Sequence, residues 1–590
     1  MHLAGWLLVA ALAAGGDDIA SARAVFQANL DAIRNRDRDV YLSCYLNAQT
    51  LARTGPEGFT LGYEPFAAQA GDGWPDLFEA SSMQLVPVRP GVVYGTYRYR
   101  VRYGADEQTG ISERLFIKTD TRQPYGGWRI AMTSALPALA GTPPPPRALA
   151  GGTLLDGTGG PPVADAVVVV RAGKIDCAGP RAACPVPAGV EVVDTSGKWI
   201  TPGLIDAHVH FSQTGWADGR PDALDLRDAH PYEGTQAELR AHPERFFRAY
   251  LCSGVTAVFD VGGYPWTLSL RETAEADTRA PHLAAAGPLL STRDHWLNLP
   301  AERQFIFLKD AASAREGVAY LKSRGADAVK VWFIVSEPGS FEELSAAVME
   351  AGSAASAAGL PLIVHATGLR EAKVALKAGA KLLVHSVGDV EVDQEFIDLA
   401  LKTGAIYCPT LTVRDGYGRM AHSVAQNVPP EVDDPHGCVD PGTLDKIRST
   451  PVAGKGEVTP EESDRRAARI ASGRVTMSNN LKRVVEAGIP IAMGTDAGNP
   501  LTLHGPSVYA EMEAMQAAGL TPMQVLVAST QGGARAMGRL QTLGTLAPGK
   551  AGDLLVLSAD PSADIRNMRQ AVQVMRGGVL RRIEEFAPAF

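Results

Sequence analysis

Between residues 199 and 540, apolar segments of strand length alternate with segments of helical pattern, and this alternation restricts the fold more than any other feature. Strands joined by helices run parallel in one sheet, because each helix returns the chain to the same end of the sheet. Eight such strands close into a (β/α)8 barrel with its active site at their carboxyl ends. The predicted fold class is therefore α/β, a TIM barrel. The predicted strands are residues 200–211, 256–261, 283–290, 328–335, 360–367, 381–387, 405–413 and 489–495.

Short strand-like segments with glycine-rich turns flank this barrel at residues 149–198 and 541–590. Both segments have this pattern of short strands and turns, so we expect them to pair in a small split β-sandwich domain. Within the barrel, residues 414–475 are rich in proline, aspartate, glycine and charge. This insertion is too long for an ordinary connection and is predicted to be a lid or a contact in a homo-oligomer.

The N-terminal part of the chain has a different pattern. Residues 19–48 have helical periodicity, and strands are predicted at residues 83–88, 92–103, 111–119 and 128–134. One long helix followed by a curved antiparallel sheet resembles the α+β cone of nuclear-transport-factor-like and ketosteroid-isomerase-like domains, and the resemblance covers residues 23–135. A linker at residues 136–148, with four consecutive prolines, is expected to space this domain from the rest.

The first residues indicate export. Residues 1–22 are interpreted as a signal peptide, because an apolar segment up to Ala14 ends in small residues. The positive charge that usually precedes such a segment is missing, so a wrongly assigned start and a short membrane-proximal helix remain alternatives. Cys177 and Cys184 flank a tight loop and could pair in an oxidising compartment. The predicted location is the periplasm or the exterior, with the cytoplasm as the alternative.

Composition excludes some function classes. The 590 residues are 45% hydrophobic and 21% charged, as in folded globular proteins with more than one domain. The formal net charge of -9 is spread along the chain, which argues against a nucleic acid partner. Past the N-terminus there is no run of 18 apolar residues, so no integral membrane span is expected. The expected partner is a small-molecule substrate.

Residue types that bind metals gather at the predicted strand ends. His208 and His210 are two residues apart on the first strand, so their imidazoles face the same side. His365 ends the fifth strand, His385 the sixth and Asp496 the eighth. Each alone has a structural explanation, such as a core histidine or, for Asp496, a helix N-cap. Their common position predicts a metal site, with zinc favoured over other divalent ions by the histidine-rich set.

Lys330 lies in the middle of the apolar fourth strand. A buried ammonium group must lose its charge or find an anionic partner. A neutral lysine can react with carbon dioxide, and the resulting carbamate has two anionic oxygens that can bridge two metal ions. The alternative is an internal ion pair, for example with Asp206.

Five motifs carry a family resemblance. They are residues 201–210 (TPGLIDAHVH), 363–366 (IVHA), 378–386 (AGAKLLVHS), 494–498 (GTDAG) followed by His504 and Gly505, and 549–557 (GKAGDLLVL). These motifs resemble the amidohydrolase superfamily, and more narrowly its imidazolonepropionase-like and Xaa-Pro-dipeptidase-like branch. The resemblance spans residues 150–582.

The resemblance implies an enzyme with two divalent metal ions. A hydroxide bridging the two ions would attack the substrate carbonyl, and Asp496 would pass its proton to the leaving nitrogen. The implied reaction is hydrolysis of a C–N bond in a small substrate such as a dipeptide or an N-acyl amino acid. The family pattern places His208, His210, carbamylated Lys330 and Asp496 around one ion, and His365, His385 and the same Lys330 around the other.

Other functions remain open. An esterase or lactonase could use the same centre, and a non-catalytic protein could bind an apolar ligand in the N-terminal cone. A single-metal deaminase is disfavoured, because such enzymes have a glutamate where this chain has Gly368. Candidate substrate contacts follow the second, third, seventh and eighth strands, namely Tyr264, His295, Tyr417 and His504. A fifth candidate, Trp332, lies two residues beyond Lys330 on the inward face of the fourth strand.

Overall fold

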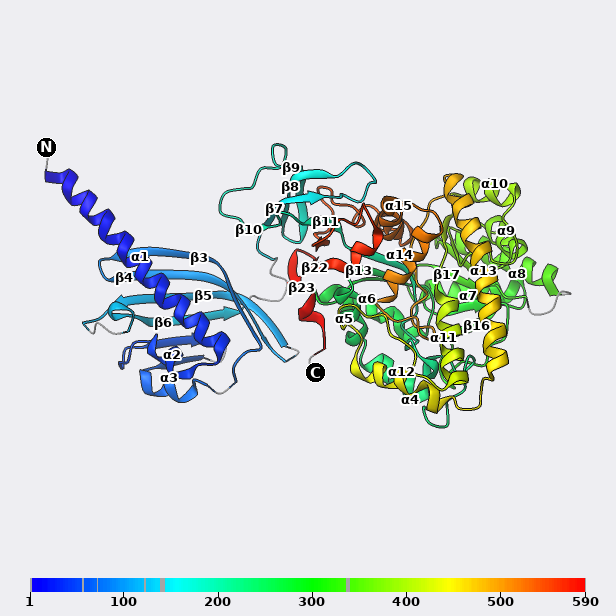
Figure 1. The fold of residues 1–590 in the computed structure, drawn as a ribbon, viewed down its shortest axis with the longest axis horizontal. Helices are drawn as coiled ribbons and strands as arrows, with labels where there is room; N and C mark the ends of the chain where they lie inside the picture. Colours follow the sequence, from blue (N-terminus) through cyan, green and yellow to red (C-terminus); the bar gives the residue numbers. More distant parts are fainter. Residues whose placement is uncertain are drawn as a thin grey trace. The chain divides into compact units, whose positions relative to one another are not determined.

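The computed structural model describes residues 3–55, 58–71, 73–104, 106–120, 124–137, 144–335 and 340–588 (Figure 1). They form two compact units, one of Met1–Pro143 with Gly189–Glu191, the other of Pro144–Ala188 with Val192–Phe590. The division at residue 143 falls inside the predicted linker. Within the described residues, no helix combines the length and apolar content needed to cross a bilayer.

The first unit packs helices against a six-stranded sheet with the order β2-β1-β6-β5-β4-β3. All neighbouring strands are antiparallel except β1 and β6, which are parallel. The described order of a helix followed by a mainly antiparallel sheet agrees with the expected α+β pattern, and the nuclear-transport-factor-like assignment stays a prediction. The elements are α1 (Leu3–Asn35), α2 (Arg38–Ser43), β1 (Ala52–Gly55), β2 (Gly58–Leu61), α3 (Tyr63–Gln69), β3 (Leu77–Arg89), β4 (Val92–Tyr103), β5 (Asp106–Lys118) and β6 (Trp128–Pro137).

The long N-terminal helix differs from the sequence prediction at its carboxyl end. The prediction of one helix over residues 19–48 is wrong, because Arg36 has a left-handed φ of 55° and interrupts it. The Asp37 side chain then caps α2 by accepting a hydrogen bond from the Val40 N–H at 3.0 Å. Residues 3–22 of the predicted signal peptide belong to α1, and residues 1 and 2 lie outside the described residues.

The second unit begins and ends in one eight-stranded sheet, with the order β23-β22-β21-β11-β7-β8-β9 and β10 beside β7. Segments from both ends of the unit meet where β11 pairs with β21 antiparallel and with β7 parallel. Cys177 and Cys184 form a disulfide at the end of β9. The strands are β7 (Arg147–Leu154), β8 (Val163–Arg171), β9 (Lys174–Pro180), β10 (Glu191–Asp194), β11 (Trp199–Pro202), β21 (Leu554–Leu557), β22 (Ala571–Arg576) and β23 (Val579–Arg582).

The predicted first barrel strand is two strands. β11 belongs to the eight-stranded sheet, and the chain then changes sheets at Gly203 to begin β12 (Leu204–Val209). Gly203 is required there, because a Cβ atom would lie 2.1 Å from Thr256 Oγ1. The predicted third strand is likewise divided into β14 (His282–Ala285) and β15 (Leu289–Ser291).

Parallel strands occupy the centre of the unit in two sheets, β12-β13-β14 and β16-β15-β17-β18-β19-β20. Residues 490–497 join the outer strands of these sheets. On one side Ala492 N–H donates to Tyr407 O at 3.0 Å, and on the other Asp496 N–H donates to His208 O at 2.7 Å. This mixed α/β arrangement is consistent with a TIM-barrel-type fold. The remaining strands are β13 (Val255–Asp260), β16 (Phe305–Phe307), β17 (Val329–Trp332), β18 (Leu362–His365), β19 (Leu382–Val384) and β20 (Ile406–Cys408).

The segment predicted as an insertion, residues 414–475, is mostly helical. It contains α12 (Pro441–Ala453) and parts of α11 (Val413–Gln426) and α13 (Pro460–Glu486). A second disulfide, Cys252–Cys438, ties this segment to α5, although the sequence left both cysteines unassigned. The other helices are α4 (Tyr232–Ala241), α5 (Glu244–Cys252), α6 (Leu270–Ala276), α7 (Ala311–Ser323), α8 (Phe341–Ala357), α9 (Leu369–Lys377), α10 (Gln394–Thr403), α14 (Ser507–Ala517), α15 (Pro522–Val527) and α16 (Gly533–Ala536).

Candidate metal centre

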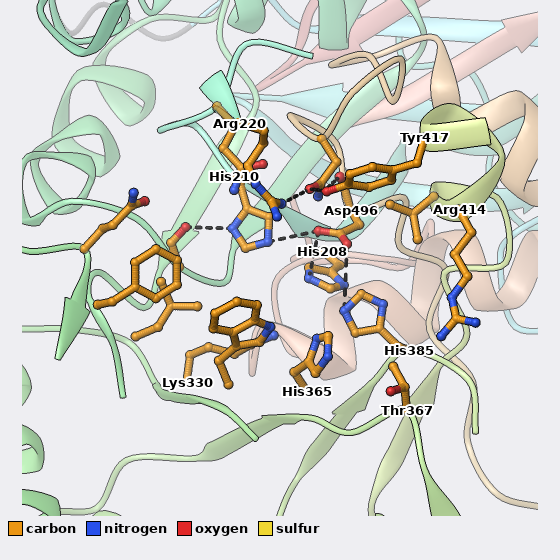
Figure 2. A pocket seen from close by; sticks show the side chains of 18 residues that line it. His208, His210, Arg220, Lys330, His365, Thr367, His385, Arg414, Tyr417 and Asp496 are labelled. Carbon is orange, nitrogen blue, oxygen red and sulfur yellow. Dashed lines mark hydrogen bonds and ion pairs between the residues drawn. The ribbon is translucent and has the colours of Figure 1, made fainter. Parts of the chain in front are cut away.

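The His-X-His pair and Asp496 form the centre of a buried cluster (Figure 2). His208 lies in β12 and His210 directly after it, and both point to the same side because side chains alternate along a strand. Asp496 Oδ1 lies 3.3 Å from His208 Nε2 and 3.0 Å from His210 Nε2. The last parallel segment thus brings its carboxylate onto the two histidines of the first strand.

Two more histidines extend the cluster. His365 ends β18 and His385 follows β19, and their ring centroids are 4.3 Å apart. His385 Nε2 lies 3.7 Å from Asp496 Oδ2, and the His385 ring is 4.9 Å from that of His208. Ligand atoms of His208, His385 and Asp496 all lie within 4.8 Å of one another. This spacing suits a shared cation.

Lys330 reaches the same cavity from β17. Its side chain is only 1% exposed, and within the described residues its ammonium group makes no hydrogen bond or ion pair. Burial lowers the pKa of Lys330 to about 7, with Asp496 opposing the shift. A substantial neutral fraction is therefore present near neutral pH.

Outer contacts fix the orientation of the histidine rings. His210 Nδ1 lies 2.7 Å from the Gly262 carbonyl oxygen, and His385 Nδ1 lies 2.6 Å from Thr410 Oγ1. The first contact makes Nδ1 the donor and turns Nε2 of His210 toward the cluster. Such partners are typical of metal-binding histidines.

The backbone at the cluster is strained. His385 and Asp496 have left-handed φ values of 72° and 64°, which L-residues with a Cβ atom rarely adopt. Such conformations persist where the surroundings determine them, and they concentrate at functional sites.

Electrostatics favour neutral imidazoles and an ionised carboxylate. Burial lowers the pKa of His208 and of His365 well below the ordinary value and that of His385 to about 3. Burial alone raises the pKa of Asp496, but protonation of the adjacent His208 or His210 would favour the ionised carboxylate, and the net shift is well below the ordinary value. Neutral imidazole and anionic carboxylate are the forms in which these groups bind metals.

The donor set fits a metal ion. Both ring nitrogens of His208 and Oδ1 of Asp496 are buried without a hydrogen-bond partner among the described residues. Buried polar atoms are normally paired, because leaving them unpaired costs about 1–3 kcal/mol each. A cation coordinated by Nε2 and Oδ1 would satisfy two of these atoms.

The cluster forms the floor of a pocket of about 260 Å³. The wall includes two residues that sequence reasoning predicted, Trp332 and Tyr417, and two arginines that it missed, Arg220 and Arg414. Arg220 lies in a polar loop without a periodic pattern, so no sequence signal marked it. Arg414 directly follows the predicted seventh strand, and this position at the carboxyl end of a barrel strand could have identified it as a candidate site residue. Other wall residues are Gln213, Gly262, Leu289, Gln304, Phe305, Thr367, Val413 and Asn499.

The sequence that forms this site matches a known protein family. Residues 199–580 match the model described as "Amidohydrolase family". The chain belongs to this amidohydrolase family. Imidazolonepropionase of Methylobacterium nodulans is 29% identical over 438 residues, which cover 68% of this chain and 90% of that protein.

Solved structures of other proteins share the fold of this amidohydrolase. An Xaa-Pro dipeptidase with bound methionine has a TM-score of 0.55 at 21% identity, covering 74% of this chain and 100% of its own. Molinate hydrolase has a TM-score of 0.54 at 23% identity, covering 75% and 96%. The family and these relatives identify the chain as a hydrolase that acts on carbon–nitrogen bonds, as the sequence motifs predicted.

Three candidate substrate contacts of the amidohydrolase lie outside the described pocket wall. His504 is buried between Phe211 and Phe246, accepts a hydrogen bond from Tyr250 at 2.8 Å, and donates to the Gln213 carbonyl oxygen at 2.9 Å. These contacts indicate a structural role for His504, and they do not indicate a role in substrate binding.

Tyr264 and His295 are also packed away from the cluster. Tyr264 is fully buried, and its hydroxyl donates to Tyr232 Oη at 3.3 Å. His295 accepts a hydrogen bond from Leu297 N–H at 3.1 Å, and its ring lies 5.4 Å from that of Trp332. His295 therefore supports the pocket wall rather than lining it. Position in the sequence alone could not separate these two residues from Trp332 and Tyr417, which do line the pocket.

Proposed function

We propose that this amidohydrolase is a two-metal enzyme on a (β/α)8 barrel that hydrolyses an amide bond of a small substrate. The observation that carries the proposal is Lys330, a buried lysine without a partner among the described residues, beside four histidines and an aspartate. A structural ion pair with Asp206 would be the alternative, but the Asp206 carboxylate bonds to Thr495 and the His208 N–H instead.

The residues that would hold the metal ions come from five parallel segments. The neutral Lys330 amine can add to carbon dioxide, forming an N–C bond and losing a proton, to give a carbamate whose two oxygens would be available as metal ligands. Zinc suits this histidine-rich set. When bound, the ions acidify water and polarise the scissile carbonyl. One ion would be held by His208, His210, Lys330 and Asp496, and the other by His365, His385 and Lys330.

Asp496 is the residue that would move the proton. Its carboxylate is ionised because its pKa lies well below the ordinary value, and both of its oxygens face the cluster. It can accept a proton from the attacking water and deliver it to the leaving nitrogen, which must be protonated before the C–N bond breaks. No covalent enzyme intermediate is needed.

The size of the pocket supports a small substrate. A cavity of about 260 Å³ suits a dipeptide or an N-acyl amino acid, not a protein chain. We further propose that the protein is exported. The disulfides Cys177–Cys184 and Cys252–Cys438 support this location, because disulfides persist mainly in oxidising compartments.

A chelation experiment tests the function. Dipeptides and N-acyl amino acids are screened with zinc-loaded protein, the metal is removed with a chelator, and zinc is added back. Hydrolysis should disappear with the metal and return with it. Protein that binds no metal after preparation in zinc would contradict the proposal.

A further inference from the structure

The pocket contains two arginines whose surroundings differ. Arg220 is neutralised, because its Nε and Nη2 donate to the two carboxylate oxygens of Asp222 at 2.8 Å each. Its Nη1 donates to Asn499 Oδ1, which also accepts a hydrogen bond from Tyr417. Arg220 therefore orients Asn499, and its charge is already paired with that of Asp222.

Arg414 has no such partner. It lines the pocket from the first turn of α11, and within the described residues no hydrogen bond or ion pair reaches its guanidinium. Burial alone lowers its pKa, with no nearby carboxylate to oppose the shift. By contrast Arg474, on the neighbouring helix α13, is paired with Asp415. A half-buried arginine without an anion costs desolvation energy that a bound anion would recover.

The surrounding structure holds Arg414 in place. Glu511 accepts hydrogen bonds from the N–H groups of Leu411 and Thr412 at 2.7 and 2.9 Å, which fixes the start of α11. Cβ atoms added at Gly388 and Gly473 would lie 3.8 and 3.6 Å from Arg414 Nη1. The guanidinium thus lies beside the loop that follows His385, on the side of the pocket where Figure 2 shows Thr367.

The opposite side of the cluster is apolar and aromatic. Phe305 packs on Trp332 with ring centroids 5.2 Å apart, and Trp332 lies 6.0 Å from His365. The next ring is His385, 4.3 Å from His365, and Arg414 lies beyond it. A carbonyl bound at the histidines would therefore have an aromatic surface on one side and a cation on the other.

We infer that Arg414 binds a carboxylate of the substrate, and that an apolar group on the other side of the scissile bond packs against Phe305 and Trp332. The inference rests on the proposed amide hydrolysis and defines its substrate as an amino acid N-acylated by an apolar group. Arginine suits this role, because its planar donors match both oxygens of a carboxylate.

The same wall disfavours dipeptides with a free amino group. Among the described residues that line the pocket, Asp496 is the one carboxylate, and it belongs to the metal-binding cluster. A substrate ammonium group would have no anionic partner in this part of the wall. N-acyl amino acids are therefore preferred to dipeptides of the same size.

Matched substrates test the inference. An N-acyl amino acid and its C-terminal primary amide are compared with the zinc-loaded wild type and the variants Arg414→Gln and Arg414→Lys. Hydrogen bonds to charged groups predict that Arg414→Gln lowers kcat/KM for the acid roughly 10- to 100-fold, mainly through KM. The amide should change by less than about 3-fold in the same variant, and Arg414→Lys should recover part of the acid preference.

Arg469→Gln is the control. Arg469 is exposed on α13, so this substitution removes the same charge outside the pocket. Equal losses for acid and amide in Arg414→Gln would overturn the inference. If neither compound is hydrolysed, the acid and its amide serve as stable ligands for titration calorimetry, which tests the carboxylate site separately from the proposed reaction. Selective loss of acid binding in Arg414→Gln would still support the carboxylate site, whereas equal or absent binding would refute it.

Discussion

The carboxylate of Asp206 joins β12 to the segment of residues 490–497 by accepting both the N–H and the hydroxyl of Thr495, at 3.0 and 2.6 Å. Asp206 is fully buried in β12, two residues before His208, and Thr495 directly precedes Asp496. This contact sets the position of the aspartate relative to the two histidines.

Replacing Asp206 by asparagine should therefore destabilise the protein. An asparagine oxygen can accept from the Thr495 N–H, but the NH2 group then faces the Thr495 hydroxyl, whose own hydrogen loses its acceptor. We expect the free energy of unfolding to fall by about 1–3 kcal/mol, as for other unpaired buried donors. Urea denaturation measures the change, with the exposed Asp464→Asn as control. Equal stability of the two variants would show that the contact is dispensable.

Lys330→Ala should remove metal as well as activity. If a carbamate on Lys330 bridges the two ions, its loss should reduce bound zinc below two equivalents and lower kcat/KM by more than about 100-fold. Elemental analysis by mass spectrometry counts the metal. Lys381→Ala is the matched control, since Lys381 is exposed and donates to the Thr403 carbonyl oxygen. Two bound ions in Lys330→Ala would refute the bridging role.

The two disulfides should contribute unequally to stability. Cys252 and Cys438 are separated by 186 residues and Cys177 and Cys184 by 7. Loop-closure entropy predicts that the long bridge stabilises by about 5 kcal/mol and the short bridge by about 2.5 kcal/mol. Chemical denaturation of the Cys252→Ala/Cys438→Ala and Cys177→Ala/Cys184→Ala double variants compares them. A larger loss for the short bridge would contradict this account.

Glu275 should make stability depend on pH. Burial raises its pKa, but His282 and Arg539 outweigh that effect and hold the pKa below the ordinary value of 4.5. A lowered carboxylate pKa means that the unfolded chain binds more protons, so this stabilisation is present above pH 4.5 and declines as pH falls below it. Glu275→Gln should thus be less stable at pH 7, with a difference that shrinks on acidification. Urea titrations at several pH values measure it, and Glu272→Gln, an exposed neighbour on α6, should show no such trend.

Sequence reasoning located the metal-type residues because they share strand ends. Six residues placed on the first, fourth, fifth, sixth and eighth predicted strands line one pocket, namely His208, His210, Lys330, His365, His385 and Asp496. Whether they bind two metal ions stays a prediction. The alternation of strands and helices also indicated the α/β class correctly.

Details that depend on packing were not visible in the sequence. The apolar pattern of residues 199–211 is continuous, so it could not show that the chain changes sheets at Gly203, where Thr256 excludes a side chain. The pattern of the first helix continued past Arg36, although a single left-handed residue ends it. His504 and Trp332 were both candidate substrate contacts, and only the three-dimensional packing separates the buried histidine from the tryptophan in the pocket wall.

The pairing of β11 with β21 has a consequence for the order of events during synthesis. Trp199 lies opposite Leu557, so the strand that leads directly into β12 and its histidines completes its own sheet only after the C-terminal segment has left the ribosome. Contacts so distant in sequence form slowly, because a long loop must close first. We therefore expect nascent chains that lack residues 554–582 to remain unable to assemble the centre, and to depend on chaperones until those residues emerge.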